Sequence, residues 1–269
     1  MSRRGGKMAL LGLVVAGFAF LYLPLVVLVL FSFNASKLVS VWGGWSTKWY
    51  VELFSNEQIL NAAWLSLKIA MINATGATLL GTMAGLVLAR FGRFGGRTLF
   101  TGLIAAPLVM PDVIIGISLL LTFVSMEQLV GWPQGRGLDT ILIAHITFST
   151  AYVAVVVQSR ASGLDRSIEE AALDLGARPM TAFLLVTLPM LAPALASGWL
   201  LAFTLSLDDL VIASFVSGPG SSTLPMVIFS KVRLGVTPEI NALATLLIGV
   251  VALAAGAATW IQIRRSSRA

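Results

Sequence analysis

The 269-residue sequence contains no cysteine and a single histidine. Without cysteine there are no disulfides, thiolate metal ligands or cysteine nucleophiles, and one histidine leaves little for a zinc site or for general-base catalysis. Charged residues are also scarce, at 11% of the chain, whereas soluble globular proteins carry roughly a quarter. A chain with so little charge cannot cover a water-facing surface, so we do not expect a soluble enzyme.

Apolar residues are correspondingly abundant: they make up 57% of the chain, and the mean hydropathy is +0.91. A membrane-spanning helix needs about 20 mainly apolar residues, and six runs reach that length. The first run follows MSRRGGK and is too long for a signal peptide, so we interpret it as an uncleaved helix. The sequence therefore predicts an all-α integral membrane protein forming one domain over residues 1–269. The predicted spans are 8–33, 64–89, 99–125 (broken by Pro107 and Pro111), 138–158, 191–216 and 240–263.

Lysine and arginine are distributed unevenly between these spans. With the N-terminus inside, twelve of the 18 basic residues fall in inner segments, namely Arg3, Arg4, Lys7, Arg90, Arg93, Arg97, Arg160, Arg166, Arg178, Arg264, Arg265 and Arg268. The outer loops hold five, namely Lys37, Lys48, Arg136, Lys231 and Arg233, and Lys68 lies within the second span. Because cytoplasmic loops collect basic residues, this distribution predicts six helices with both termini in the cytoplasm. The net charge of +6 is thus explained by membrane orientation, and no nucleic-acid partner is expected.

The first outer loop is rich in tryptophan. Trp42, Trp45 and Trp49 are spaced i, i+3, i+7, so on a short helix they would share one face. We interpret them as an aromatic belt at the membrane interface, and the alternative is a docking surface for an outside partner.

The inner connection at 159–189 is the most structured segment outside the predicted spans. Asp165 is a plausible N-cap for a helix over 168–175, and Gly176 is expected to end that helix. Pro179 then suits the first turn of a second helix. A short helix held parallel to the membrane is well placed to dock into a cleft on a cytoplasmic protein.

The same segment carries a spaced motif. It contains Glu170-Ala171-Ala172, three residues, Gly176, nine residues, Val186, one residue and Leu188-Pro189. This pattern resembles the EAA signature of the inner-membrane permease subunits of bacterial ATP-binding-cassette importers, and it departs from that signature only at Val186. The segments SFNASKLVSVWGGWSTKWY, APLVMPDVIIGISLLL, RSIEEAALDLGA, GWLLAFTLSLDDLVIASFVSGPGSSTLPM and VTPEINALATL resemble the polyamine branch, most closely the second permease subunit of putrescine importers. The likeness covers nearly the whole chain.

The resemblance implies a type I importer permease fold, also called MetI-like, in the bacterial inner membrane. It also implies a second homologous permease, two ATP-binding subunits and a periplasmic polyamine-binding protein as partners. We expect no cofactor on this chain, because ATP and magnesium would be bound by the ATP-binding subunits; no G-x-x-x-x-G-K-[ST] loop occurs. In the family the EAA loop forms a coupling helix that fits a groove on the ATPase, and the alternative here is a solvated acidic helix face. The expected coupling residues are Glu169, Glu170, Ala171, Ala172, Asp174 and Gly176.

Acidic residues inside predicted spans are costly and need a reason. A diaminobutane-like dication is positive at both ends and apolar in the middle, so its path should offer carboxylates and aromatic faces. The candidate path residues are Asp112, Phe203, Asp208, Asp209 and Phe215. The alternative is that an aspartate pairs with a neighbouring subunit or caps a broken helix. We interpret His145 as a packing residue rather than a proton carrier, and Gly81 and Gly85 as a close helix-packing motif.

Several functions remain open at this point. Within the importer reading, the cargo can be putrescine, spermidine or another solute. A transporter driven by an ion gradient is the alternative from a different class, with the buried aspartates as ion sites. An intramembrane enzyme would need a nucleophile and base or a metal cluster, which one histidine and no cysteine make improbable.

Overall fold

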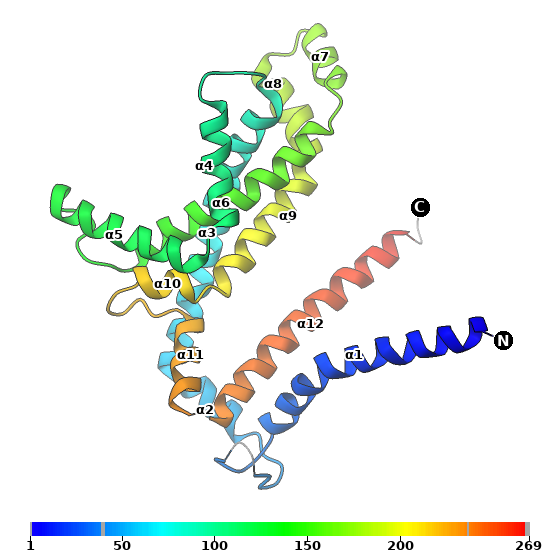
Figure 1. The fold of residues 1–269 in the computed structure, drawn as a ribbon, viewed down its shortest axis with the longest axis vertical. Helices are drawn as coiled ribbons and strands as arrows, with labels where there is room; N and C mark the ends of the chain where they lie inside the picture. The colour runs from blue at the N-terminus through cyan, green and yellow to red at the C-terminus, as the bar shows by residue number, and fades with distance from the viewer. Residues whose placement is uncertain (1, 39–40, 236, 267–269) are drawn as a thin grey trace. The chain divides into compact units, whose positions relative to one another are not determined.

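The computed structural model describes residues 2–38, 41–235 and 237–266 (Figure 1). Arg268 of the predicted inner set, and Val39, Ser40 and Val236 of the quoted segments, lie outside the described residues. Within the described part the secondary structure is helical, apart from an isolated bridge between Asn34 and Trp45. The chain divides into two compact units, one formed by the segments up to residue 60 and from 228, the other by 61–227.

The larger unit, 61–227, contains most of the helices. Helices α3, α4, α6 and α9 lie along one direction in Figure 1, and α5 and α10 cross near one end of them. The bounds are α3 Glu57–Arg90, α4 Arg97–Val109, α5 Asp112–Val130, α6 Leu138–Ser162, α7 Ser167–Asp174, α8 Pro179–Ala182, the π-helix η1 Phe183–Thr187, α9 Leu188–Leu207, α10 Val211–Val216 and α11 Leu224–Leu234. The first residues of α3, and α11 from residue 228, belong to the smaller unit.

The smaller unit is built on α1 (Ser2–Ser32), α2 (Lys48–Ser55) and α12 (Pro238–Ser266). Helices α1 and α12 contact each other and run antiparallel, so the start of α1 and the end of α12 lie on the same side of this unit (Figure 1). At the opposite end Glu239 accepts hydrogen bonds from Asn56 Nδ2 at 2.7 Å and from Lys231 Nζ at 3.1 Å. These contacts fasten the ends of α2 and α11 to the first turn of α12.

Most of the spans predicted from hydropathy correspond to helices in the structure. Predicted spans one, two, four and six fall on α1, α3, α6 and α12, although α1 and α3 begin six or seven residues before the predicted starts. By length and apolar composition, five described helical segments are able to cross a membrane: 10–32, 57–90, 112–130, 138–162 and 179–207. Two shorter apolar segments, 97–109 and 238–253, add to them.

The third predicted span is divided into α4 and α5. Met110 is extended, with φ −77° and ψ 137°, because the proline ring at 111 disfavours helical geometry in the residue before it. Helix α5 then leaves at a steep angle to α4 (Figure 1). The expected break at Pro111 is therefore confirmed, whereas the break at Pro107 is wrong, since Pro107 lies inside α4.

The fifth predicted span, 191–216, has different bounds in the structure. The helical segment begins at Pro179, because α8, η1 and α9 follow one another without a break. It ends at Leu207, and Asp208–Leu210 separates it from the short helix α10. The prediction extended the span too far because apolar residues continue through α10.

The three tryptophans of the first outer loop do not share a helix face, so that prediction is wrong. Helix α2 begins only at Lys48; Trp42 and Trp45 precede it and pack edge to face with ring centroids 5.0 Å apart. Trp49 is buried, and its Nε1 donates to the carbonyl oxygen of Asn34 at 2.6 Å. The Asn34 side chain holds the loop, because its Oδ1 accepts from the backbone N–H of Gly43 at 2.7 Å.

Small residues bring the helices of the larger unit close together. A Cβ on Gly81 of α3 would lie 2.6 Å from Val153 Cβ of α6, and one on Gly85 would lie 2.6 Å from the carbonyl oxygen of Ala154. The predicted close-packing role of these two glycines is confirmed. Asn73 of α3 adds a polar link, because its Nδ2 donates to Ser149 Oγ at 3.1 Å and to the carbonyl oxygen of Ala202 at 2.8 Å.

We expect Gly81→Ala to destabilise the protein. Overlap with Val153 costs about 1–3 kcal/mol, which exceeds the roughly 1 kcal/mol that alanine gains over glycine within a helix. Gly102→Ala in α4 is the matched control, because no heavy atom lies within 4 Å of its added Cβ. The measurement is thermal unfolding of the purified protein in detergent, and equal midpoints for the two variants would contradict close packing at Gly81.

Candidate functional site

The segment that carries the spaced motif begins with a side-chain turn. Asp165 Oδ1 accepts a hydrogen bond from the backbone N–H of Ser167 at 2.9 Å, and α7 starts at Ser167. Hydrogen bonds from the backbone and side chain of Ser167 lower the pKa of Asp165. A carboxyl with a lowered pKa stabilises the folded loop above its unfolded pKa, and this stability is lost as the pH falls through the folded value. The N-cap position itself is Arg166, one residue after the predicted cap.

The same helix ends in a Schellman motif. The N–H of Gly176 donates to the carbonyl oxygen of Leu173 at 2.9 Å, and the N–H of Ala177 donates to that of Ala172 at 3.1 Å. Gly176 has a φ of +87°, which a residue with a Cβ rarely adopts. Pro179 then opens α8 as its first residue. The predicted stop at Gly176 and start at Pro179 are both confirmed.

Helix α7 has two different faces. Glu169 and Ala172 are half-buried, whereas Glu170, Ala171 and Asp174 are exposed. Glu170 and Asp174 are four residues apart and therefore lie on the same face. Leu175, just beyond α7, is 90% exposed. The outward side of the segment thus combines two carboxylates with a large uncovered apolar side chain.

The inward side of α7 meets the end of α3. Glu169 Oε2 lies 3.3 Å from Arg90 Nη2, and Arg166 Nη2 donates to the carbonyl oxygen of Arg90 at 3.3 Å. Arg97 closes the end of α3, because its guanidinium donates to the carbonyl oxygens of Leu88 at 2.9 Å, Phe91 at 2.7 Å and Gly92. The sequence analysis counted Arg90, Arg93 and Arg97 only among the inner basic residues. The sequence does not indicate which of these arginines pairs with which carboxylate.

A second polar cluster lies where α9 ends. Asp209 accepts hydrogen bonds from the backbone N–H groups of Ile212 at 3.2 Å and Ala213 at 2.7 Å. Its Oδ2 also lies 3.1 Å from Nε2 of the buried His145, whose Nδ1 lies 2.7 Å from Ser206 Oγ. The alternative that an aspartate caps a broken helix is therefore confirmed for Asp209. His145 is a buried packing residue with both ring nitrogens in hydrogen-bond contact.

The other predicted path residues lie on α5, at the end of α9 and on α10. Asp208 is exposed at the C-cap of α9, and Asp112 is exposed at the first position of α5, directly after the break at Pro111. Phe203 stacks on Trp199, a neighbour that the sequence analysis did not single out, with ring centroids 5.4 Å apart. Phe215 packs against Gly116, where an added Cβ would lie 2.5 Å from its ring.

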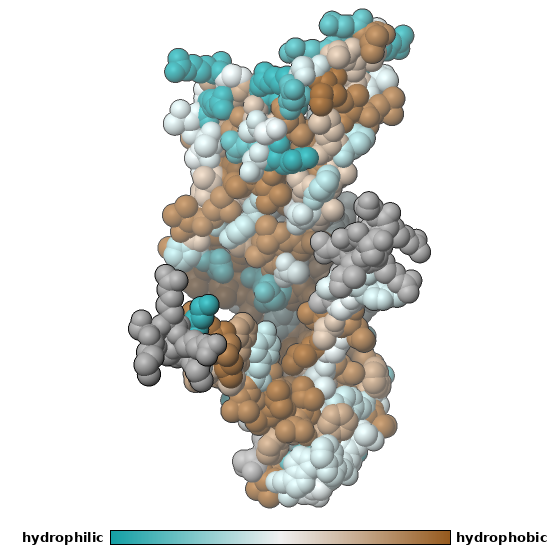
Figure 2. Space-filling view, turned by 90° about the vertical axis from the view of Figure 1, so that its right-hand side faces the viewer, coloured by the Kyte–Doolittle hydropathy of each residue, from teal (hydrophilic) through white to brown (hydrophobic). Residues whose placement is uncertain are grey.

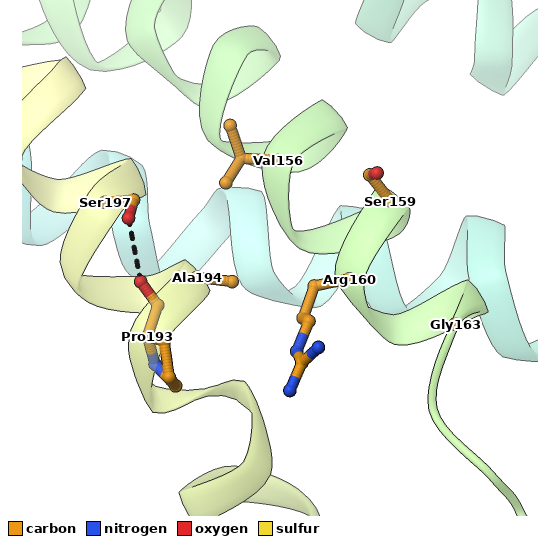
Figure 3. Close-up of a pocket in the computed structure, with 7 residues that line it drawn as sticks. All are labelled: Val156, Ser159, Arg160, Gly163, Pro193, Ala194 and Ser197. Atoms are coloured by element: carbon orange, nitrogen blue, oxygen red, sulfur yellow. Dashed lines mark hydrogen bonds between the residues drawn. The ribbon is translucent and has the colours of Figure 1, made fainter.

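A groove of about 580 Å³ lies between α6 and α9, near the end of α6 that leads to α7 (Figure 3). Arg160 extends from α6 toward α9, and Ser197 Oγ donates to the carbonyl oxygen of Pro193 at 2.9 Å. The sequence analysis counted Arg160 only among the inner basic residues. The lining residues are Val156, Ser159, Arg160, Gly163, Pro193, Ala194 and Ser197.

Residues 77–265 match the family described as the binding-protein-dependent transport system inner membrane component. The chain belongs to this family. It is 61% identical over 252 residues to the putrescine transport system permease protein PotI of Escherichia coli K12, covering 94% of this chain and 89% of that protein. It is 42% identical over 244 residues to the spermidine/putrescine transport system permease protein PotC of the same strain, covering 90% and 89%.

Among solved structures, a chain of a bacterial transporter that imports the acidic polysaccharide alginate superposes with a TM-score of 0.73. The superposition covers 97% of this chain and 98% of that one, and the two are 15% identical. The fold is therefore that of importer permeases, as the sequence predicted. The protein is an inner-membrane permease subunit of an ATP-binding-cassette importer, a transport component and not an enzyme.

The two adjacent aspartates make different hydrogen bonds. We therefore expect alanine substitutions at the two positions to change the stability of the protein by different amounts. Asp209→Ala leaves His145 and two N–H groups without their acceptor, which costs about 1–3 kcal/mol. Asp208→Ala changes an exposed side chain and should stay within about 0.5 kcal/mol of the parent. Thermal unfolding in detergent measures both, and an equal loss of stability in the two variants would refute the capping role of Asp209.

Proposed function

We propose that this chain, with a second homologous permease, forms the pathway of an importer for putrescine. The observation that carries the proposal is the 61% identity to the putrescine permease PotI over 94% of the chain, compared with 42% to PotC. Spermidine is the second candidate cargo, favoured by the likeness to PotC. In this proposal a periplasmic polyamine-binding protein delivers the cargo.

The exposed carboxylates suit a small dication. Asp208 and Asp112 each lie at a helix break with the side chain exposed, so each can accept an ammonium group without first losing an intramolecular partner. Phe203 and Trp199 add a stacked aromatic pair that favours cations and methylene chains. In this assignment Asp209 and Phe215 support the pathway from behind, through the cap on α10 and the packing against Gly116.

The arrangement of charges along α3 supports the proposed membrane position. Lys68 and the exposed Trp64 border a small surface groove on α3. Lys68 is about 33 Å from Arg90 along the helix axis, close to the ~30 Å hydrocarbon thickness. Each cation then reaches a different membrane surface, and the tryptophan lies at the interface that it prefers.

The proposed topology has six crossings. They are made by α1, α3, α4 continued by α5, α6, α8–α9 and α12, with residues 159–189 as a cytoplasmic loop and both termini in the cytoplasm. The antiparallel contact of α1 with α12 supports termini on one side. In Figure 2 the end of the larger unit that carries α7 is largely hydrophilic, and a more apolar surface lies below it. We assign this end to the cytoplasm.

The proposed docking surface for the ATP-binding subunits is the outward side of α7. Glu170, Ala171 and Asp174 are exposed there, and Leu175 is 90% exposed. Outside the bilayer, a large uncovered apolar side chain beside carboxylates suits a partner groove with a basic rim and an apolar floor. Gly176 allows the close turn behind this surface. Two ATP-binding subunits, which also hold ATP and magnesium, would supply the energy, and this chain would hold no cofactor of its own.

Uptake of labelled putrescine into vesicles that contain the reconstituted importer tests the function. We expect uptake that requires ATP and persists when the ion gradients are collapsed. Unlabelled spermidine should compete less well than unlabelled putrescine. Putrescine uptake driven by an ion gradient without ATP would contradict the importer assignment. Preferential uptake of spermidine would identify spermidine as the cargo in place of putrescine.

The same assay tests Asp208 as a path residue. Asp208→Ala should lower ATP-dependent uptake about tenfold or more, since the loss of a contact to a charged group costs at least about 1.5 kcal/mol. Asp139→Ala, an exposed aspartate at the start of α6, is the matched control. Normal uptake by an assembled Asp208→Ala importer would remove this residue from the pathway.

A further inference from the structure

The last residue of α3 is bonded to the motif-bearing helix α7. Arg90 Nη2 and Glu169 Oε2 are 3.3 Å apart, and the two side chains are 19% and 34% exposed. Arg166, at the N-cap of α7, donates to the carbonyl oxygen of Arg90 at 3.3 Å. Residue 90 thus contacts the start of α7 through both its side chain and its backbone. We call Arg90, Arg166 and Glu169 the clasp.

Helix α7 depends on such contacts for its position. It has eight residues, and none of them is buried. Isolated helices shorter than about 12 residues are marginal in water, so α7 must be held by its surroundings. It packs on α8 and η1, which follow it in the chain. The clasp adds a connection to a helix that is far from it in sequence.

Helix α3 is suited to carry a movement from this point. It has 34 residues and is about 51 Å long. Arg97 binds the carbonyl oxygens at its end, and Gly81 and Gly85 seat it tightly against α6. We therefore expect a displacement of Arg90 to move α3 as a unit.

We propose that Arg90 is a positioning residue that joins α7 to α3 through Glu169, so that ATPase-driven movement of α7 reaches the membrane helices. The inference rests on the proposed docking of α7. It gives the two neighbouring glutamates different roles, because Glu169 points inward to Arg90 while Glu170 is exposed toward the partner. Glu169 acts in coupling as an intramolecular link, not as an ATPase contact.

A charge exchange tests the clasp in the complete reconstituted importer. The variants are Arg90→Glu, Glu169→Arg and the double exchange, and the readout is putrescine taken up per ATP hydrolysed. We expect each single reversal to lower this ratio about tenfold, within the range of coupling between residues in one ion-pair network. ATP hydrolysis should continue in these variants. The double exchange should return the ratio to within about threefold of the parent, because the pair is restored with opposite polarity.

Arg93→Glu is the matched control, an exposed arginine in the same turn, and it should leave the ratio unchanged. If a reversal prevents assembly, Arg90→Gln, Glu169→Gln and their double variant complete a neutral cycle. The effects of the two single changes on the ratio of putrescine uptake to ATP hydrolysis should then be non-additive. A double exchange no better than the worse single variant, or additive neutral changes, would overturn the clasp.

A cross-link separates failure of the clasp from failure of the proposed docking. The chain has no cysteine, so Leu175→Cys introduces a unique thiol beside α7. Labelled with a maleimide that carries a photoactivatable benzophenone, this thiol should cross-link to the ATP-binding subunit on illumination, in the parent background and in Arg90→Glu. A cross-link without coupling between Arg90 and Glu169 rejects the clasp alone. Absence of the cross-link in the parent background rejects the docking surface and the clasp with it.

Discussion

Backbone groups that leave a helix inside a membrane have no water to bind, and much of this structure follows from that constraint. Two breaks between helices of the larger unit, after α4 and after α9, have such a local solution. Pro111 has no N–H to satisfy where α4 gives way to α5, and Asp209 accepts the N–H groups that open α10. In the α3–α4 turn, which the proposed topology places in the cytoplasm, Arg97 likewise binds the carbonyl oxygens that end α3. At Pro111 the residue that interrupts the helix is therefore also one that leaves no N–H group without a partner.

The need to satisfy backbone groups at a helix break also explains why Asp208 and Asp209 differ in their hydrogen bonds. Asp209 is fully engaged by His145 and by the start of α10. Its neighbour Asp208 stays exposed because the chain turns between them. A rigid cap and an available carboxylate thus arise from adjacent positions. Elsewhere in the larger unit, Gly81 and Gly85 bring α3 close to α6, since helices surrounded by lipid associate through close contact of small residues.

The sequence predicted much of this fold but not its contacts. Hydropathy located α1, α3 and α6, and the turn chemistry of Gly176 and Pro179 located the end of α7 and the start of α8. Hydropathy failed at α9 because apolar residues continue beyond the break that Asp208 and Asp209 mark. The tryptophan spacing failed because Asn34 holds an irregular loop where a helix was assumed. The pairing of Arg90 with Glu169 joins segments that are distant in the sequence. It could not be predicted, because several other inner basic residues were equally suitable partners for Glu169.

The π-helix η1 lies between the loop helix α8 and the long helix α9. A π-turn holds about one residue more than an α-turn, which shifts the helix face by about 100°. The side chains before η1 are therefore out of phase with those after it, although the backbone is continuous. One uninterrupted helical segment can in this way direct the side chains of its first turn toward the loop. The side chains of its remaining turns are directed toward the other membrane helices.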